Sequence, residues 1–460
     1  MLKELAREKH LFGSVLVDML EIHNQEEVSM SKNRIISTRA SLLSAFFLGS
    51  FILVEAAEQG ISHNLDVVDM VQKRHRLVPS DDIWWATTGE QMAWMHKNVH
   101  QLFPTVNVYR SGQVKSLESS PNADINQFPI ETADGTMSFA SLLQSDLTTT
   151  LGLLVLHKGK IVFESYPRMK EYEKPIYWSV TKVMPAMLVR LLEERGVVDV
   201  EKEVDYYIPE LAASDFAGIK IRHILDMSTG LDCQDEYQNR QSCYYQYSMA
   251  IGDGFREESS PDNPYDFLKT LKVTRHGEPG EQFSYSGVNT FVLAWLVEKI
   301  TGEPFQDTFT KEVWSKIGAE SDASFLAYRY GIPLTHGGFL SNMRDMARFG
   351  LLFTPSYKVV SEDRIVTENT LELLLDRPNP NLIRSDGSHN IYQWDYIDQD
   401  GFMIKGGWGG QALVVNPKLD IVAVYTSYFK DDYSQQNLRD PMLKVLRELY
   451  LKNLLIKLYL

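Results

Sequence analysis

The sequence lacks the residues and motifs that mark common cofactor and metal sites. Its 460 residues include two cysteines, and no Cys/His cluster has the spacing of a zinc site. A Walker loop and a Gly-x-Gly-x-x-Gly motif are also missing, so nothing indicates a nucleotide cofactor. The absence of a Gly-x-Ser-x-Gly elbow disfavours an α/β-hydrolase. We therefore expect neither a metal nor an organic cofactor.

Positive charge is scarce as well. The chain has 46 Lys and Arg against 61 Asp and Glu, a formal net charge of −15, and no basic stripe. We therefore expect no nucleic-acid partner and no acidic-membrane partner. Hydrophobic residues at 44% and charged residues at 23% are ordinary for a globular enzyme. The length fits two to three domains, or one domain with an inserted subdomain.

The N-terminal region has the pattern of an export signal. Positive residues precede an uncharged apolar run at 40–54, and small residues at cleavage spacing follow it. We predict a signal peptide over 30–57 and a periplasmic or extracellular protein, with membrane contact only if this segment stays uncleaved. The charged leader 1–29 has two interpretations: the true start is Met30, or the leader is a tethered N-terminal helix.

Ser179 and Lys182 form the most informative short motif. A strand-turn-strand pattern over 151–166 precedes them, and an apolar-periodic stretch over 183–195 follows. This context predicts a helix that starts at Ser179, with Lys182 one turn later on the same face. A lysine in a crowded, positively charged pocket can lose its proton and then accept that of a serine hydroxyl. The alternative is a helix start with a capping serine and a solvated lysine.

Ser-x-x-Lys alone is weak evidence, because the chain contains it three times. The pair Ser29/Lys32 lies in the leader. The pair Ser427/Lys430 sits in the strand-like run 421–429, where residues three apart point to opposite faces. Helical periodicity follows Ser179 alone among the three serines.

Two downstream segments complete a larger pattern. The segment 282–287 holds Tyr285 ahead of a helical run, and the segment 401–411 holds Lys405 ahead of two strand-like runs. With these motifs, 151–429 resembles the serine β-lactamase and penicillin-binding-protein superfamily, in particular its class C-like esterase and amidase branch of 6-aminohexanoate-dimer hydrolase type. The resemblance implies an α+β, β-lactamase/transpeptidase-like fold: an antiparallel sheet flanked by helices, with an inserted helical subdomain.

The resemblance also implies catalytic roles. Ser179 is the expected nucleophile, and Lys182 accepts or shuttles its proton. Tyr285 is the expected partner, which accepts a proton as phenolate and returns it to the leaving group; the alternative is a core tyrosine ahead of a helix. Lys405 is expected to hold Tyr285 deprotonated and to attract a substrate carboxylate.

An oxyanion hole and a substrate-binding strand are expected beside these residues. The natural oxyanion donors are the backbone N–H groups of Ser179 and Trp408. Gly406 and Gly407 are expected to let the strand approach substrate closely. His336 begins a second match to the third motif, His-x-Gly, but a helical run follows it, so we prefer Lys405.

Two departures from the family motifs bear on the substrate. Gly287 stands where Tyr-x-Asn has its asparagine, and Gly406 replaces the threonine of Lys-Thr-Gly. Both changes weaken recognition of a peptide or β-lactam backbone, so a small-molecule ester or amide is the expected substrate. Two alternatives stay open: a β-lactamase or D-Ala-D-Ala carboxypeptidase, and a non-catalytic peptidoglycan- or ligand-binding relative. Oligomeric state is not predicted.

Cys233 and Cys243 lie ten positions apart in one loop-like stretch. In an oxidising compartment they could form a local disulfide, and the alternative is two unrelated thiols. The same stretch is rich in tyrosines that either shape the acyl pocket or lie on the surface. These tyrosines are Tyr237, Tyr244, Tyr245 and Tyr247.

The expected organisation follows from these anchors. An N-terminal extension over 58–130 precedes a β-lactamase-like domain over 131–460, whose helical subdomain covers about 184–280. An amphipathic helix over 441–460 is expected to pack on the sheet, with a membrane-surface role as the alternative.

Overall fold

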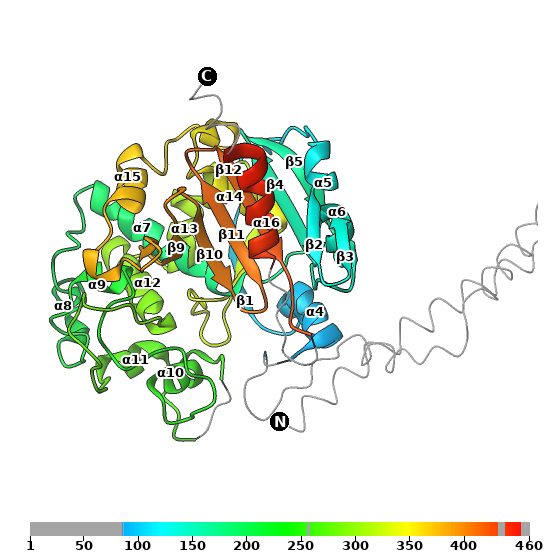
Figure 1. The fold of residues 1–460 in the computed structure, drawn as a ribbon. Helices are drawn as coiled ribbons and strands as arrows, with labels where there is room; N and C mark the ends of the chain where they lie inside the picture. Colours follow the sequence, from blue (N-terminus) through cyan, green and yellow to red (C-terminus); the bar gives the residue numbers. More distant parts are fainter. Residues whose placement is uncertain (1–84, 86, 255–257, 431–437, 452–460) are drawn as a thin grey trace, which may run out of the picture. The chain divides into compact units, whose positions relative to one another are not determined.

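A seven-stranded antiparallel sheet lies at the centre of the structure, a computed structural model (Figure 1). The structure describes residues 85, 87–254, 258–430 and 438–451, which belong to one unit, Arg76–Leu460. The expected leader and signal peptide, 1–57, lie outside the described residues. The strand order is β5-β4-β12-β11-β10-β9-β8. The strands are β4 (Gly152–His157), β5 (Lys160–Ser165), β8 (His389–Ile391), β9 (Trp394–Ile397), β10 (Met403–Gly407), β11 (Gln411–Asn416) and β12 (Ile421–Thr426).

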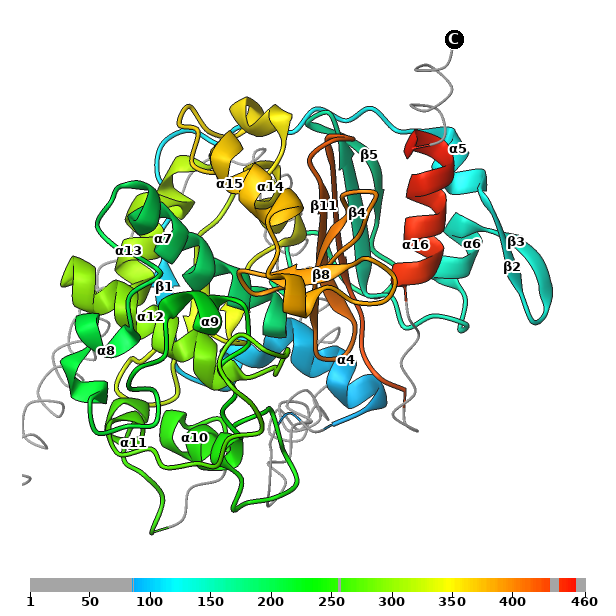
Figure 2. The same cartoon turned by 60° about the vertical axis from the view of Figure 1, so that its left-hand side comes forward.

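The sheet is apolar on both faces because its side chains alternate. In β12, Val422 and Val424 join one hydrophobic core, whereas Ile421 and Ala423 join the other. Each face is therefore covered by its own set of helices (Figure 2). This arrangement confirms the predicted fold class.

On one face, α14 (Met343–Leu351) packs against β4, β11 and β12. Beyond it lie the helices that separate β5 from β6 (Ala323–Leu326). They are α7 (Val183–Glu194), α8 (Val204–Tyr207), α9 (Ile221–Leu225), α10 (Cys243–Ile251), α11 (Pro264–Lys269), α12 (Gly287–Thr301) and α13 (Phe305–Glu312), with the 3-10 turns η4 (Pro209–Leu211) and η5 (Trp314–Lys316). The expected helical subdomain covers the first part of this region, and the helices continue beyond residue 280 through α13.

The other face is covered by α16 (Arg439–Leu446), with Met442 and Leu443 in the core beneath it. The described part of the helix expected over 441–460 therefore packs on the sheet as predicted, and a π-turn, Arg447–Leu451, extends it. Residues 452–460 of that prediction lie outside the described residues. The same layer holds α5 (Ala123–Gln127), α6 (Phe139–Gln144), β2 (Pro129–Thr132) and β3 (Gly135–Ser138).

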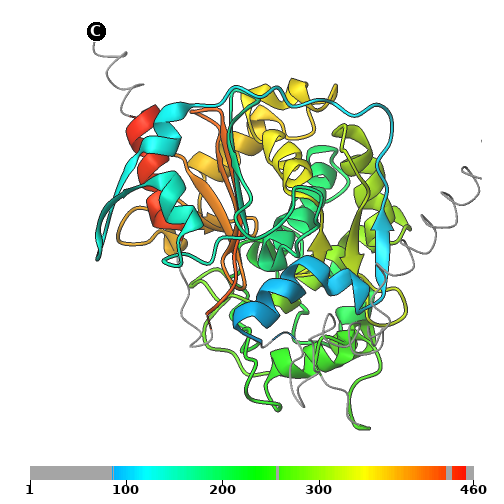
Figure 3. The ribbon, with the colours of Figure 1, turned by 90° about the vertical axis from the view of Figure 1, so that its right-hand side faces the viewer.

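The described part of the N-terminal extension has a helix as its first element. Its helix α4 (Gly89–Asn98, blue in Figure 3) is followed by η2 (Val99–Gln101) and by β1 (Thr105–Val108). The strand β1 pairs with β6, which in turn pairs with β7 (Phe339–Leu340). Two backbone bonds fix α4: Gly89 N–H donates to Phe429 O, and Ile176 N–H donates to His96 O, each at 2.8 Å.

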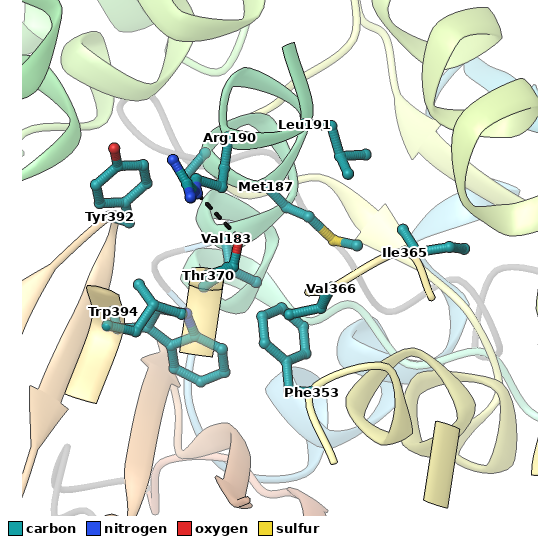
Figure 4. Close-up of a pocket in the computed structure, with 12 residues that line it drawn as sticks. Val183, Met187, Arg190, Leu191, Phe353, Ile365, Val366, Thr370, Tyr392 and Trp394 are labelled. Carbon is teal, nitrogen blue, oxygen red and sulfur yellow. Dashed lines mark hydrogen bonds between the residues drawn. The ribbon is translucent and has the colours of Figure 1, made fainter. Parts of the chain in front are cut away.

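A small apolar cavity of about 20 Å³ lies between α7 and α15 (Glu368–Asp376) (Figure 4). Val183, Met187 and Val366 line it, and at its edge Arg190 Nε donates to Thr370 Oγ1 at 2.9 Å. The remaining 3-10 turns are η3 (Trp178–Lys182), η6 (Pro355–Val359) and η7 (Pro380–Leu382). In the part of the chain described, no helix has the length and apolar character to span a bilayer.

Candidate active site

Ser179 lies in a tight turn at the start of α7. The turn is a 3-10 helix, Trp178–Lys182, and α7 begins at Val183. Lys182 Nζ donates to Ser179 Oγ at 3.0 Å, so the predicted pair shares one face. Trp178, the residue before the serine, has a φ of +46°. Such a conformation costs a bulky residue roughly 1–3 kcal/mol, and the surrounding structure must hold it.

Lys182 is buried and only 1% exposed. Its Nζ also donates to His336 O at 2.8 Å and lies 3.9 Å from Asp235 Oδ2. Burial lowers the pKa of Lys182 to about 8; Asp235 opposes that shift, and Lys405 adds to it. A substantial fraction of the side chain is therefore neutral amine near pH 8, which is the form that can accept a proton.

Tyr285 stands two residues before α12, between the two lysines. Lys405 Nζ donates to Tyr285 Oη at 3.3 Å, and the Nζ atoms of Lys182 and Lys405 lie 4.9 and 4.7 Å from the ring centroid. Burial raises the pKa of Tyr285 well above 10, and Asp395 and Asp235 raise it further. These shifts favour the neutral phenol, whereas the sequence-based expectation was a phenolate.

The positive charge of Lys405 is paired. Lys405 is fully buried on β10 and forms an ion pair with Asp395 on β9 at 2.5 Å. The other carboxylate oxygen of Asp395 accepts the Gly406 N–H at 3.1 Å. The Asp395 charge offsets the field that was expected to deprotonate Tyr285 and to attract a substrate carboxylate.

Asp235 is a site residue that the sequence did not reveal. Its Oδ1 accepts the Gly287 N–H at 2.6 Å, and its Oδ2 accepts the Tyr237 hydroxyl at 3.2 Å. A Cβ atom on Gly287 would lie 2.8 Å from His336 Cδ2. No asparagine fits there without a shift of His336, and the Asp235 carboxylate is the polar group beside Lys182 instead. Gly287 was the only signal of this change.

His336 contributes to the site through its backbone. Its carbonyl accepts the Lys182 bond, whereas its ring is buried between the hydroxyl groups of Tyr244 and Tyr247, at 3.2 and 3.0 Å. Of the two candidates for the third motif, Lys405 is the one whose side chain contacts Tyr285, so Lys405 stays the preferred candidate.

Cys233 and Cys243 are joined by a disulfide, with their Cα atoms 4.9 Å apart. The loop that it closes carries Asp235 and Tyr237, and α10 begins at Cys243. Tyr244, Tyr245 and Tyr247 are buried, at 2% exposure or less, so the alternative of surface tyrosines is wrong for these three.

Strand β10 passes directly against the serine turn. A Cβ atom on Gly407 would lie 2.5 Å from Tyr177 O and 3.2 Å from Trp178 Cβ. The absence of a side chain at Gly407 therefore lets the strand approach the protein's own backbone. The sequence-based expectation was that this glycine would let the strand approach the substrate. This close approach brings together the segments that carry the N–H groups of Ser179 and Trp408, the expected oxyanion donors. A Cβ atom on Gly406 would lie 3.8 Å from Asp395 Oδ2, which is ordinary van der Waals contact, so a small side chain would meet no clash at its first atom.

Aromatic rings surround the serine turn. Trp85 from the N-terminal extension packs 5.5 Å from Trp178, 4.7 Å from Tyr237 and 5.2 Å from Trp408, between ring centroids. Trp408 also packs against Phe429 at 4.9 Å. Sequence patterns do not place these rings, because they come from segments far apart in the chain.

The assembled groups are a serine hydroxyl, a lysine of lowered pKa and a tyrosine hydroxyl, with strand β10 packed against the serine turn. This set can carry out acyl transfer through serine. Among the described residues, no group of three or more His, Cys, Asp or Glu could hold a metal ion.

Comparisons with known proteins show what the chain is similar to. The chain is 27% identical over 364 residues to the 6-aminohexanoate-dimer hydrolase of Paenarthrobacter ureafaciens, covering 77% of this chain and 89% of that protein. A putative 6-aminohexanoate-dimer hydrolase from Bacillus anthracis superposes with a TM-score of 0.65 at 23% identity, covering 79% of this chain and 93% of the other. A family VIII carboxylesterase superposes with a TM-score of 0.50 at 17% identity, covering 68% and 95%.

A family model also matches the part of the chain that holds the site. The model described as Beta-lactamase matches residues 139–443, which is more than half of the sequence. The chain therefore belongs to the Beta-lactamase family, a family of hydrolases.

Proposed function

We propose that the protein is a serine hydrolase that cleaves a small ester or amide through an acyl-Ser179 intermediate. The observation that carries the proposal is the 3.0 Å approach of Lys182 Nζ to Ser179 Oγ, together with the burial that lowers the pKa of Lys182 to about 8. A buried, partly neutral amine in contact with a serine hydroxyl is the arrangement that activates the serine.

The steps follow from the contacts. The neutral amine of Lys182 takes the hydroxyl proton as Ser179 Oγ attacks the substrate carbonyl. The N–H groups of Ser179 and Trp408 receive the developing oxyanion. The phenol of Tyr285 donates its proton to the leaving group and regains one from the Lys182 ammonium. Water then attacks the acyl ester, with Lys182 again as base, and the serine hydroxyl is restored.

The substrate class rests on the closed space at Gly287. Because His336 and Tyr244 occupy that space, no asparagine side chain is available to bind a substrate amide as in Tyr-x-Asn enzymes. An ester or a small amide needs no such contact. The names of the similar proteins include a 6-aminohexanoate-dimer hydrolase and a family VIII carboxylesterase, which supports this class.

A short p-nitrophenyl ester tests the proposal, with an amide such as the 6-aminohexanoate dimer assayed in parallel. We expect turnover by the wild type and none by Ser179→Ala, with an unchanged circular-dichroism spectrum. Equal turnover in the variant would refute the serine mechanism. Durable acylation by penicillin without ester turnover would favour the β-lactamase or carboxypeptidase alternative, and binding without acylation would favour a non-catalytic relative.

We also propose that the protein is exported, through the signal expected at 30–57. The Cys233–Cys243 disulfide supports export, because such bonds persist in oxidising compartments. Cell fractionation of the full chain and of a chain without residues 30–57 tests this proposal. Equal retention of both forms in the cytoplasm would refute it.

A further inference from the structure

His96 lies directly behind the serine turn, on helix α4 of the N-terminal extension, and belongs to none of the family motifs. The side chain is fully buried. Its Nε2 accepts a hydrogen bond from the indole Nε1 of Trp178 at 3.0 Å, and its Nδ1 lies 2.8 Å from Ser427 O. His96 O also accepts the Ile176 N–H at 2.8 Å.

These contacts define one tautomer of the ring. An indole N–H can only donate, so His96 Nε2 must carry a lone pair. A carbonyl can only accept, so Nδ1 must carry the proton and donate it to Ser427 O. Burial lowers the pKa of His96 to about 4, which keeps the ring neutral and this pattern intact at neutral pH. The imidazole thus acts as a fixed bridge, donating on one side and accepting on the other.

One end of this bridge is the strained residue of the catalytic turn. Trp178 holds a φ of +46°, which an unrestrained tryptophan would leave. The indole is tied to His96, and the neighbouring Tyr177 N–H donates to Phe339 O at 2.9 Å. The direction of the Ser179 N–H depends on this conformation, because Ser179 is the next residue.

The other end of the bridge reaches the second oxyanion segment. A Cβ atom on Gly409, the residue after Trp408, would lie 2.5 Å from His96 Cε1, so the ring packs directly on that backbone. Gln411 Nε2, on β11, donates to Ser427 O at 3.1 Å, so it shares this acceptor with His96 Nδ1. One imidazole therefore touches both segments that supply the proposed oxyanion donors.

We propose that His96 is a positioning residue that sets the spacing between the Ser179 and Trp408 N–H groups, so that the N-terminal extension completes the oxyanion hole. The inference rests on the proposed serine mechanism. Misplacing a catalytic group by about 1 Å costs on the order of 100-fold in rate, and losing one oxyanion donor costs on the order of 100- to 1,000-fold. A side chain that fixes both donors can therefore control the rate without touching substrate.

The test compares His96→Leu with His96→Gln, whose Oε1 can replace Nε2 as acceptor for the Trp178 indole. For His96→Leu we expect kcat to fall about 10- to 100-fold with KM within about two-fold, since oxyanion contacts act in the transition state. Affinity for a boronic acid, which mimics the tetrahedral intermediate, should fall in parallel with kcat/KM. His96→Gln should recover most of both losses.

Met95→Ala is the matched control, because Met95 is fully buried on the same helix and its side chain is apolar. It should lower the melting temperature while leaving kcat and boronate affinity within about two-fold of wild type. Trp178→Phe removes the same hydrogen bond from the other side, so it replaces His96→Leu if that variant does not fold, and the same losses are expected.

Unchanged kcat and boronate affinity in His96→Leu and Trp178→Phe would overturn the inference, and so would equal losses in Met95→Ala. Neither result would affect the proposed function, which fails only if the wild type lacks turnover or Ser179→Ala retains it.

Discussion

Asp235→Asn should move the acid limb of the pH–rate profile to lower pH. The limb reports the loss of the Lys182 proton, with a pKa of about 8. Asp235 raises that pKa, because its carboxylate stabilises the ammonium form. Removing the charge therefore makes the amine lose its proton more easily. The variant should keep its fold, since the amide oxygen of the substituted side chain can still accept the Gly287 N–H.

The size of the shift follows from the 3.9 Å distance between Lys182 Nζ and Asp235 Oδ2. At this separation two unit charges interact by about 1 kcal/mol in water and about 4 kcal/mol at an effective dielectric constant of 20. One pKa unit corresponds to about 1.4 kcal/mol. The acid limb should therefore move down by roughly one to three units, from about pH 8 to between about 5 and 7.

The assay is kcat/KM for a p-nitrophenyl ester between pH 5 and 9, because this ratio reports the free enzyme. Asp232→Asn is the control: Asp232 lies in the same loop but is exposed and accepts a hydrogen bond from Thr274. Its limb should stay at the wild-type position. If the acid limb of Asp235→Asn moved to higher pH or did not move, the coupling of this carboxylate to the catalytic base would be refuted.

Four further outcomes are expected. Tyr285→Phe should lower kcat by about 100-fold or more, because the proton donor to the leaving group is lost; near-wild-type turnover would exclude that role. Replacing Cys233 and Cys243 by serine should lower the free energy of unfolding in urea by about 3 kcal/mol, which is the loop entropy for their separation of 10. It should also lower activity, because the loop holds Asp235. Identical unfolding curves would contradict the stability prediction. His96 has a pKa of about 4 in the folded chain and 6.5 in the unfolded chain, so the unfolded chain binds the proton first and the free energy of unfolding should fall by about 3 kcal/mol as the pH drops from about 6.5 to 4. Urea unfolding of the wild type and of His96→Gln at both pH values measures this loss. An equal loss in the variant would contradict it. Val366→Ile should fill the cavity beside α7 and raise stability by up to about 1 kcal/mol; a lower melting temperature would show that the site cannot accept the methylene.

Short-range patterns predicted the fold well. The apolar runs around residues 151–166 and 421–428 form β4, β5 and β12, and the helix that follows Lys182 starts at Val183. These elements are local and strongly periodic, so their period identifies them. The motif residues Ser179, Lys182 and Tyr285 also meet as expected, because the order of the motifs reflects one known fold.

The charge state of the site could not be predicted in this way. Lys405 was expected to act as a free positive charge, but Asp395 pairs with it from the neighbouring strand. Asp235 reaches Lys182 from a loop more than 50 positions away. A pKa depends on every charge within several ångströms, whereas a sequence motif records only neighbours along the chain.

The sequence also did not predict that the N-terminal extension contacts the serine turn. Trp85 and His96 contact the serine turn through tertiary packing, and neither belongs to a spacing that names a function. A lone buried histidine on an apolar helix face is usually a core residue. Its partners, the strained Trp178 and the backbone at Gly409, become visible only in three dimensions.

Labelling by a fluorophosphonate tests the central claim most directly, because the reagent bonds to an activated serine without turnover. The labelled protein is digested, the adduct is located by mass spectrometry, and the labelling rate is measured from pH 6 to 9. We predict a single adduct on Ser179, none in Ser179→Ala, and a rate that rises with pH through about 8 as Lys182 loses its proton. An adduct on another residue, or an unchanged rate in Lys182→Ala, would contradict the account.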